Sequence, residues 1–82
     1  MDLVKYTETI ISSLVSSKDS LAVKEFPSES ARELVIQVLV SKDDMPKLIG
    51  KGGKTINAIR TLVQAASYKQ ENKIIKINVD SI

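Results

Sequence analysis

The chain has 82 residues, 43% of them hydrophobic and 27% charged, which is enough for one small domain with a modest core. It contains neither cysteine nor histidine, so disulfides, thiolate metal sites and the commonest general base are excluded, and most enzyme classes lose support. The net charge of +2 hides a basic region at residues 45–82, where seven basic and two acidic residues can attract a polyanion or form a solvated face.

The first half of the chain predicts one helix followed by two strands. Apolar residues recur with helical spacing over residues 2–16, and Asp2 can cap the first turn. A short strand is expected at 21–26. The strongest strand signal is ELVIQVLVS at 33–41, which is apolar at most positions and suits a central strand.

The second half predicts two helices separated by glycines, and then a last strand. Asp44 can cap a short helix over 45–49, which Gly50 ends. A longer helix runs from about residue 53 to 69, and alternating isoleucines and valine at 73–79 indicate a strand. This order is that of an α+β fold, with three helices packed on one three-stranded sheet.

The glycine-rich stretch LIGKGGKTI, residues 48–56, contains all three glycines of the chain. Its GKT run at 53–55 suggests a nucleotide-binding phosphate loop, but that motif requires a glycine where Leu48 stands. The dinucleotide motif G-x-G-x-x-G also fails, because its third glycine would fall on a threonine. What remains is G-x-x-G at 50–53, between two helices.

A G-x-x-G turn between helices can hold phosphate for a simple physical reason. Glycines allow a tight turn and a close approach of another backbone, and the second helix points its free N–H groups at the loop. Lys51 and Lys54 add positive charge on and beside it. The plainer alternative is a helical corner that needs glycines only to turn. We favour a grip on a nucleic-acid backbone, because the flanking helices and lysines agree with it.

At this point the sequence resembles a KH domain. LIGKGGKTI matches the family core of an apolar pair, G-x-x-G, two residues and Ile. The element order resembles the type II KH arrangement, α-β-β-α-α-β with a three-stranded mixed sheet, as a single domain over residues 1–82. The stretch IGKGGKTINAIRTLVQAAS at 49–67 is especially similar to the KhpA family of small bacterial single-KH-domain proteins. One departure is Gly52, where many relatives carry a bulkier polar residue.

The resemblance implies a cytoplasmic protein that binds single-stranded RNA and is not an enzyme. It also implies an RNA-chaperone role with ties to cell elongation and cell shape, a homodimer, and pairing with a larger KH-domain protein of the KhpB type. No cofactor, metal or membrane contact is expected. A competing interpretation is a protein-interaction module that mainly scaffolds a KH-domain partner. The basic loop favours RNA.

The candidate RNA-binding residues lie on and around the loop: Lys47, Ile49, Gly50, Lys51, Gly52, Gly53, Lys54, Thr55, Ile56 and Arg60. For three of them, a role unrelated to RNA is at least as well supported by the sequence. Ile56 belongs to the apolar stripe of the long helix and is more often core. The Thr55 hydroxyl can bond locally, and Arg60 can simply be solvated.

The long helix carries a second candidate surface. Its apolar arc, which includes Leu62, is already wide enough to face the sheet, and Ala58 and Ala65 extend it to about half the circumference. Alanine is also a good helix former, so the alanines alone prove nothing. We expect these three residues to form a dimer interface.

Overall fold

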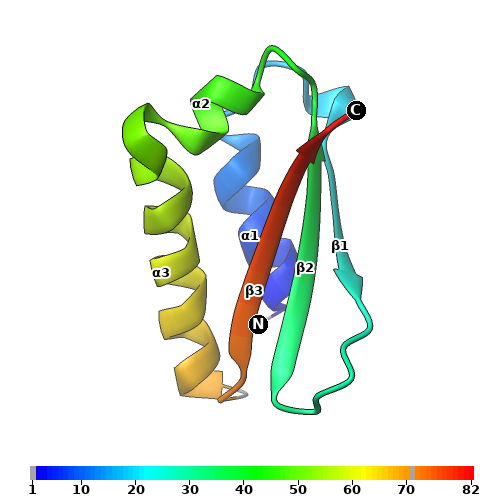
Figure 1. Cartoon of the computed structure of the whole chain (residues 1–82), viewed down its shortest axis with the longest axis vertical. Coiled ribbons are helices and arrows are strands. Elements are labelled where there is room, and N and C mark those ends of the chain that lie inside the picture. The colour runs from blue at the N-terminus through cyan, green and yellow to red at the C-terminus, as the bar shows by residue number, and fades with distance from the viewer. Residues whose placement is uncertain (1, 71) are drawn as a thin grey trace.

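The computed structural model describes residues 2–70 and 72–82 (Figure 1). The elements are α1 (Leu3–Ser12), β1 (Ala22–Phe26), β2 (Glu33–Val40), α2 (Met45–Ile49), α3 (Lys54–Gln70) and β3 (Ile74–Ser81), with 3₁₀ turns at Lys18–Ser20 and Lys51–Gly53. None of the helices in these two described ranges has the length and apolar character needed to cross a membrane.

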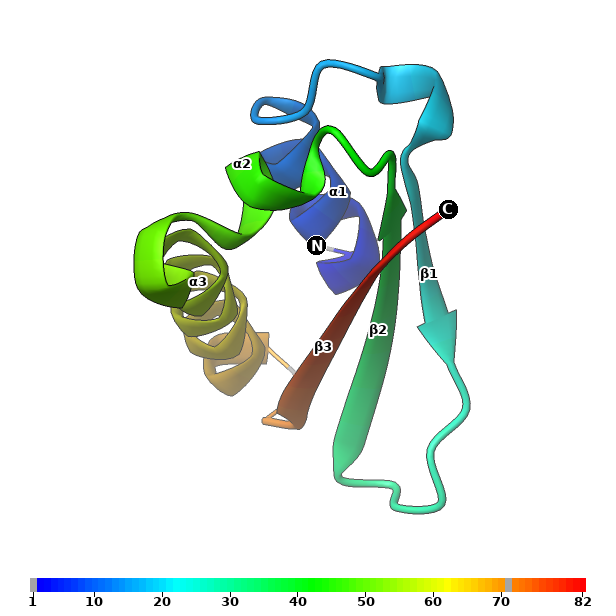
Figure 2. The same ribbon diagram turned by 45° about the horizontal axis from the view of Figure 1, so that its top comes forward.

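The three strands form one mixed sheet in the order β1-β2-β3. β1 pairs antiparallel with β2, and β2 pairs parallel with β3, so the predicted type II arrangement is confirmed. Alternate residues of β2, from Leu34 to Val40, are buried. The helices cover that face of the sheet, and the opposite face stays uncovered (Figure 2).

The core lies between this sheet face and the helices. α1 contributes Leu3 and Ile11, and α3 contributes Ile59 and Val63, all nearly or fully buried. Each such side chain stabilises the fold by about 1.5–3 kcal/mol through burial. The short α2 packs mainly against α3, and its Leu48 is completely buried. α2 therefore lies at the end of the helical layer, where it carries the glycine loop.

Two element boundaries differ from the sequence prediction by more than one residue. The N-cap at Asp2 is confirmed, since its Oδ1 accepts the Val4 N–H at 2.9 Å, but α1 ends at Ser12 and not at residue 16. The Ser13 hydroxyl bonds the Ile10 carbonyl at 2.7 Å, and the chain then turns away from the helix. β3 extends two residues past the predicted end, because Ser81 still pairs with Val40.

Candidate functional site

The glycine loop begins at Gly50, whose backbone geometry only glycine adopts readily. Its φ of 76° and ψ of 173° lie in a region almost closed to other residues. A Cβ placed here would lie 2.2 Å from the Thr55 Oγ1, far inside contact distance. The first turn of α3 therefore packs directly against Gly50, and the Thr55 hydroxyl lies beneath the loop.

Lys51 and Gly52 are open to solvent, and Gly53 is partly buried. Gly52 has a φ of 66° and Gly53 a φ of 80°, and a Cβ at Gly52 would meet nothing within 4 Å. The Gly53 N–H donates to the Gly50 carbonyl at 3.2 Å. Lys51 and Gly52 come first in the 3₁₀ turn, so the turn offers no acceptor for their N–H groups. Neither N–H group donates a hydrogen bond among the described residues.

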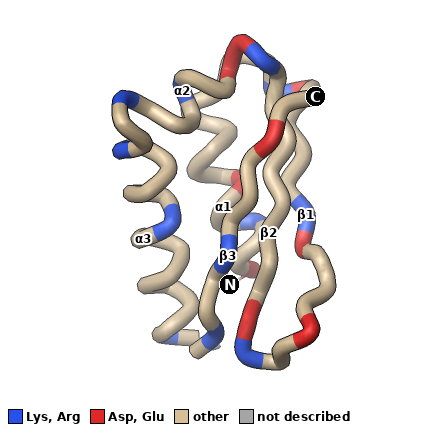
Figure 3. Tube along the Cα trace, in the orientation of Figure 1, with Lys and Arg blue, Asp and Glu red and all other residues tan. Residues whose placement is uncertain are grey.

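Positive charge surrounds this loop. Lys51 and Lys54 are both exposed, and the positive end of the 17-residue α3 points at the same turn. Figure 3 shows basic positions at the α2–α3 corner and along α3, with acidic positions on other elements. The result is an exposed backbone turn that favours an anion.

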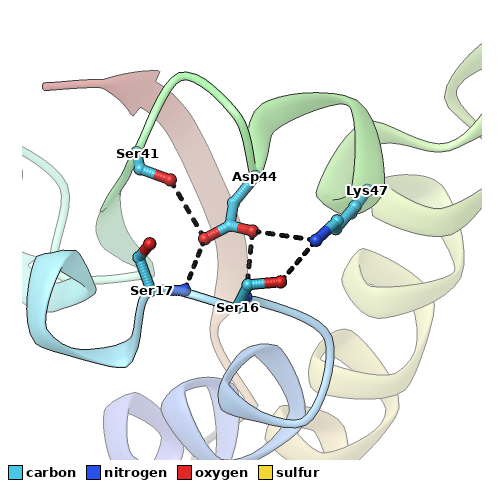
Figure 4. A network of polar contacts seen from close by, with 5 residues as sticks. All are labelled: Ser16, Ser17, Ser41, Asp44 and Lys47. Atoms are coloured by element: carbon cyan, nitrogen blue, oxygen red, sulfur yellow. Dashed lines mark hydrogen bonds and ion pairs between the residues drawn. The ribbon is translucent and has the colours of Figure 1, made fainter.

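Asp44, directly before α2, does not cap that helix as the sequence suggested. Its buried carboxylate instead accepts the backbone N–H groups of Ser16 and Ser17, both at 2.9 Å (Figure 4). The Ser41 hydroxyl donates to it at 3.0 Å. The prediction of a local cap was wrong because two N–H groups distant in sequence compete for the same oxygens.

These bonds hold Asp44 in its charged form. Hydrogen bonds from the Ser16 and Ser17 N–H groups, the largest causes, lower the pKa of Asp44 from 3.8 to about 2, with help from Ser41 and Lys47. The Lys47 ammonium lies 3.5 Å from Asp44 and also bonds the Ser16 hydroxyl. Lys47 thus points toward the α1–β1 connection, although its side chain remains half exposed.

Arg60 lies across the gap between α3 and β3. Its guanidinium donates to the Ile77 carbonyl at 3.0 Å and to the Asn57 side chain at 3.2 Å. Further along, the Gln64 side chain bonds both the Ile75 N–H and the Lys73 carbonyl, each at 2.9 Å. Polar side chains of α3 therefore hydrogen-bond backbone N–H and C=O groups in and just before the first half of β3, on the side away from β2.

The apolar candidates separate into a buried and an exposed group. Ile56 is only 4% exposed and belongs to the core, so it supports the loop from below. Ile49 is half-buried at the end of α2, packed against that core. Ala58, Leu62 and Ala65 share the solvent-facing side of α3, and Leu62 is 50% exposed.

Comparison with known proteins gives the family. The sequence model of the KhpA/KhpB KH domain matches residues 4–79. A protein named RNA-binding protein KhpA from Caldanaerobacter subterraneus subsp. tengcongensis is 39% identical over 90% of this chain and 92% of its own length. Proteins of the same name from Clostridium acetobutylicum and Listeria monocytogenes are 37% and 38% identical, over 83% and 80% of this chain and 88% and 84% of their own lengths.

The chain belongs to the KhpA/KhpB KH domain family. The family match runs from α1 into β3, so it includes the helix–G-x-x-G–helix unit and the strand beside it. Within residues 2–70 and 72–82, no group of three His, Cys, Asp or Glu side chains gathers as a metal site would need.

Sequence reasoning missed two parts of this KH domain. It did not find the Asp44 anchor, because nothing local signals a bond between residues 28 positions apart. It also overlooked Gln64 and Ser67 as partners of β3. Arg60, Gln64 and Ser67 recur at helical spacing beside the core stripe, and that polar row was a readable signal for a covered strand edge.

Proposed function

We propose that this chain binds single-stranded RNA by gripping its sugar-phosphate backbone with the G-x-x-G loop at 50–53, and that it performs no chemistry on it. The observation that carries the proposal is the loop itself. It combines open glycine backbone, two N–H groups that donate no hydrogen bond among the described residues, the positive end of α3 and two exposed lysines. The RNA-binding names of its relatives agree with this conclusion.

The grip would work through backbone first and side chains second. A phosphate at the loop accepts the N–H groups of Lys51 and Gly52, while the ammonium groups of Lys51 and Lys54 neutralise it. Ile49 offers an apolar surface beside the loop. Across the gap, Val79 of β3 turns its N–H and C=O away from β2, where they can meet a base edge.

The test replaces phosphate-facing groups by carboxylates. In the double variant Lys51→Asp/Gly52→Asp, negative charge stands where phosphate should bind, and the open space at Gly52 accepts the new side chain. Affinity for a short single-stranded RNA should fall roughly tenfold or more. The dependence of affinity on salt should also weaken by about one phosphate contact. Fluorescence anisotropy over a salt series measures both.

A matched control makes the same change in total charge at a different place on the protein. Ser28→Asp/Arg32→Asp alters the β1–β2 connection, at the opposite end of the sheet from the loop (Figure 1). It should retain most of the affinity. Equal binding by the two variants, with both folded by circular dichroism, would mean that the loop is not the RNA site.

We propose further that the exposed row Ala58, Leu62 and Ala65 pairs two copies of this chain in the cytoplasm. The small alanines let a second α3 approach closely, and a two-fold axis would place each Leu62 in the hollow beside the other copy's Tyr6. The same surface could receive a KhpB-like KH domain. Two linked grips would hold one RNA more tightly than one and suit an RNA chaperone.

This interface is tested by Leu62→Glu, with Leu14→Glu as the control at an exposed leucine that does not belong to α3. Leu62→Glu should give a folded monomer in sedimentation or light scattering, whereas Leu14→Glu should retain the dimer mass. A dimer that survives Leu62→Glu excludes this surface.

A further inference from the structure

A hollow lies between α3 and β3, farther along α3 than the glycine loop. It is lined by Arg60, Thr61, Gln64, Ala65, Tyr68 and Ile75, and its volume is about 410 Å³. Tyr68 is 56% exposed, which makes it the most exposed aromatic side chain among the described residues. Leu62 and Tyr6 belong to a neighbouring hollow, on the flank of α3 that faces α1, and Ala65 lines both hollows.

We propose that this hollow, through the exposed ring of Tyr68, receives a further nucleobase of the same RNA strand that the loop grips. The proposal rests on the RNA-binding function proposed above. The bound RNA would then continue past the loop and along α3 to a second contact at Tyr68. The rise of the helix places Tyr68 about 21 Å from Lys54. The ligand is thus one nucleobase, held mainly by stacking.

Continuity between the two sites is the first argument. Arg60 lines the hollow and also bonds the Ile77 carbonyl, so the same guanidinium forms the boundary between the upper and lower halves of the α3–β3 gap. In both views α3 and β3 are well separated near the loop and converge toward the C-terminal end of α3, beside the start of β3 (Figures 1 and 2). A strand leaving the loop along this gap meets the hollow next.

Charge is the second argument. Between Lys54 and Gln70, α3 contains three basic residues and no acidic residue. Lys73 lies directly before β3. A polyanion lying along this flank therefore meets positive side chains at both ends of the helix, with no carboxylate of α3 to repel it.

The chemistry of the walls identifies stacking as the mode of binding. In this half of the gap, Gln64 and Ser67 already occupy the Ile75 N–H and the Lys73 carbonyl. These two groups of the strand edge are therefore not free to hydrogen-bond the edge of a base. What remains is an aromatic ring with apolar neighbours, Ala65 and Ile75, beside a guanidinium. Every base has a face that can stack there, so this contact should tolerate any sequence.

The experiment compares Tyr68→Ala with the wild type on oligoadenylates of about four and about ten nucleotides. The wild type should bind the longer strand more tightly. Tyr68→Ala should lose about tenfold of affinity for the longer strand and nothing for the shorter one. Tyr68→Phe should restore the affinity, because the ring and not the hydroxyl does the stacking. Phe26→Ala, at an exposed aromatic on the uncovered sheet face, should have no effect.

A direct optical signal separates stacking from structural damage. The chain has two tyrosines and no tryptophan, so in a Tyr6→Phe background all intrinsic tyrosine emission comes from Tyr68. The longer RNA should quench that emission. A strand of equal length with abasic residues beyond the first four positions should not.

The two proposals fail in different ways. If the longer RNA binds the wild type but Tyr68→Ala changes neither its affinity nor the length dependence, the hollow is not a base site, and the loop grip stands. Quenching by the abasic strand would likewise overturn base stacking. If the wild type binds neither RNA, the proposed function itself is wrong.

Discussion

The two ends of α2 differ in almost every physical respect, although only five residues separate them. The N-terminal end is anchored by Asp44, which is fully buried and accepts two backbone N–H groups and one hydroxyl. The C-terminal end opens into glycines with positive φ, and most of that turn is exposed. One end is fixed by hydrogen bonds, and the other is left free to meet a ligand.

This difference shows how a very short helix can carry a binding loop. A helix of five residues has little stability of its own, so its direction must be fixed by the surroundings. The buried Leu48 and the Asp44 bonds provide that fixation. The loop can then consist of glycine, with few contacts of its own, and still keep its position at the start of α3.

The largest effect should come from Gly50→Ala, because it breaks the junction between the loop and α3. The Cβ would clash with Thr55, and the φ of 76° would be strained. The free energy of unfolding should therefore fall by about 3 kcal/mol or more. Gly52→Ala provides the control. Its φ is also positive but its surroundings are open, so the loss should be nearer 1 kcal/mol. Urea denaturation measures both, and equal losses would contradict the close packing of Thr55 on Gly50.

A smaller effect is expected at the anchored end, from Asp44→Asn. Asparagine keeps one acceptor oxygen, so one of the N–H groups of Ser16 and Ser17 loses its partner and the melting temperature falls. Asp43→Asn, at the exposed neighbour, removes the same charge and should leave the melting temperature nearly unchanged. The same loss in both variants would mean that charge, and not the hydrogen bonds, matters here.

The anchor also predicts a pH dependence. The pKa of Asp44 is lowered from 3.8 to about 2, so its ionised form stabilises the folded state above pH 3.8, and that contribution is lost as the pH falls toward 2. Melting temperatures between pH 5 and 2 should therefore fall more steeply for the wild type and Asp43→Asn than for Asp44→Asn. Parallel curves for all three proteins would contradict a charged, hydrogen-bonded Asp44.

The same contrast explains what the sequence could and could not predict. The order of helices and strands and the loop at 50–53 follow from hydrophobic spacing and from glycine, which are local signals. The end of α1 and the role of Asp44 depend on bonds between residues 16–17 and 44, and tertiary contacts override a local cap preference. Nor could the sequence tell which glycine is essential for packing, because that depends on where Thr55 lies.

The smallest effect should come from Lys47, which the sequence placed among the RNA contacts. Its ammonium is engaged by Asp44 and the Ser16 hydroxyl, so it belongs to the anchored end of α2. Lys47→Gln should change RNA affinity less than twofold, whereas Lys51→Gln should weaken it severalfold and reduce the salt slope by about one contact. Titrations at two salt concentrations distinguish these outcomes. A loss at Lys47 as large as at Lys51 would mean that the ammonium leaves Asp44 to meet phosphate, and that the anchor opens when RNA binds.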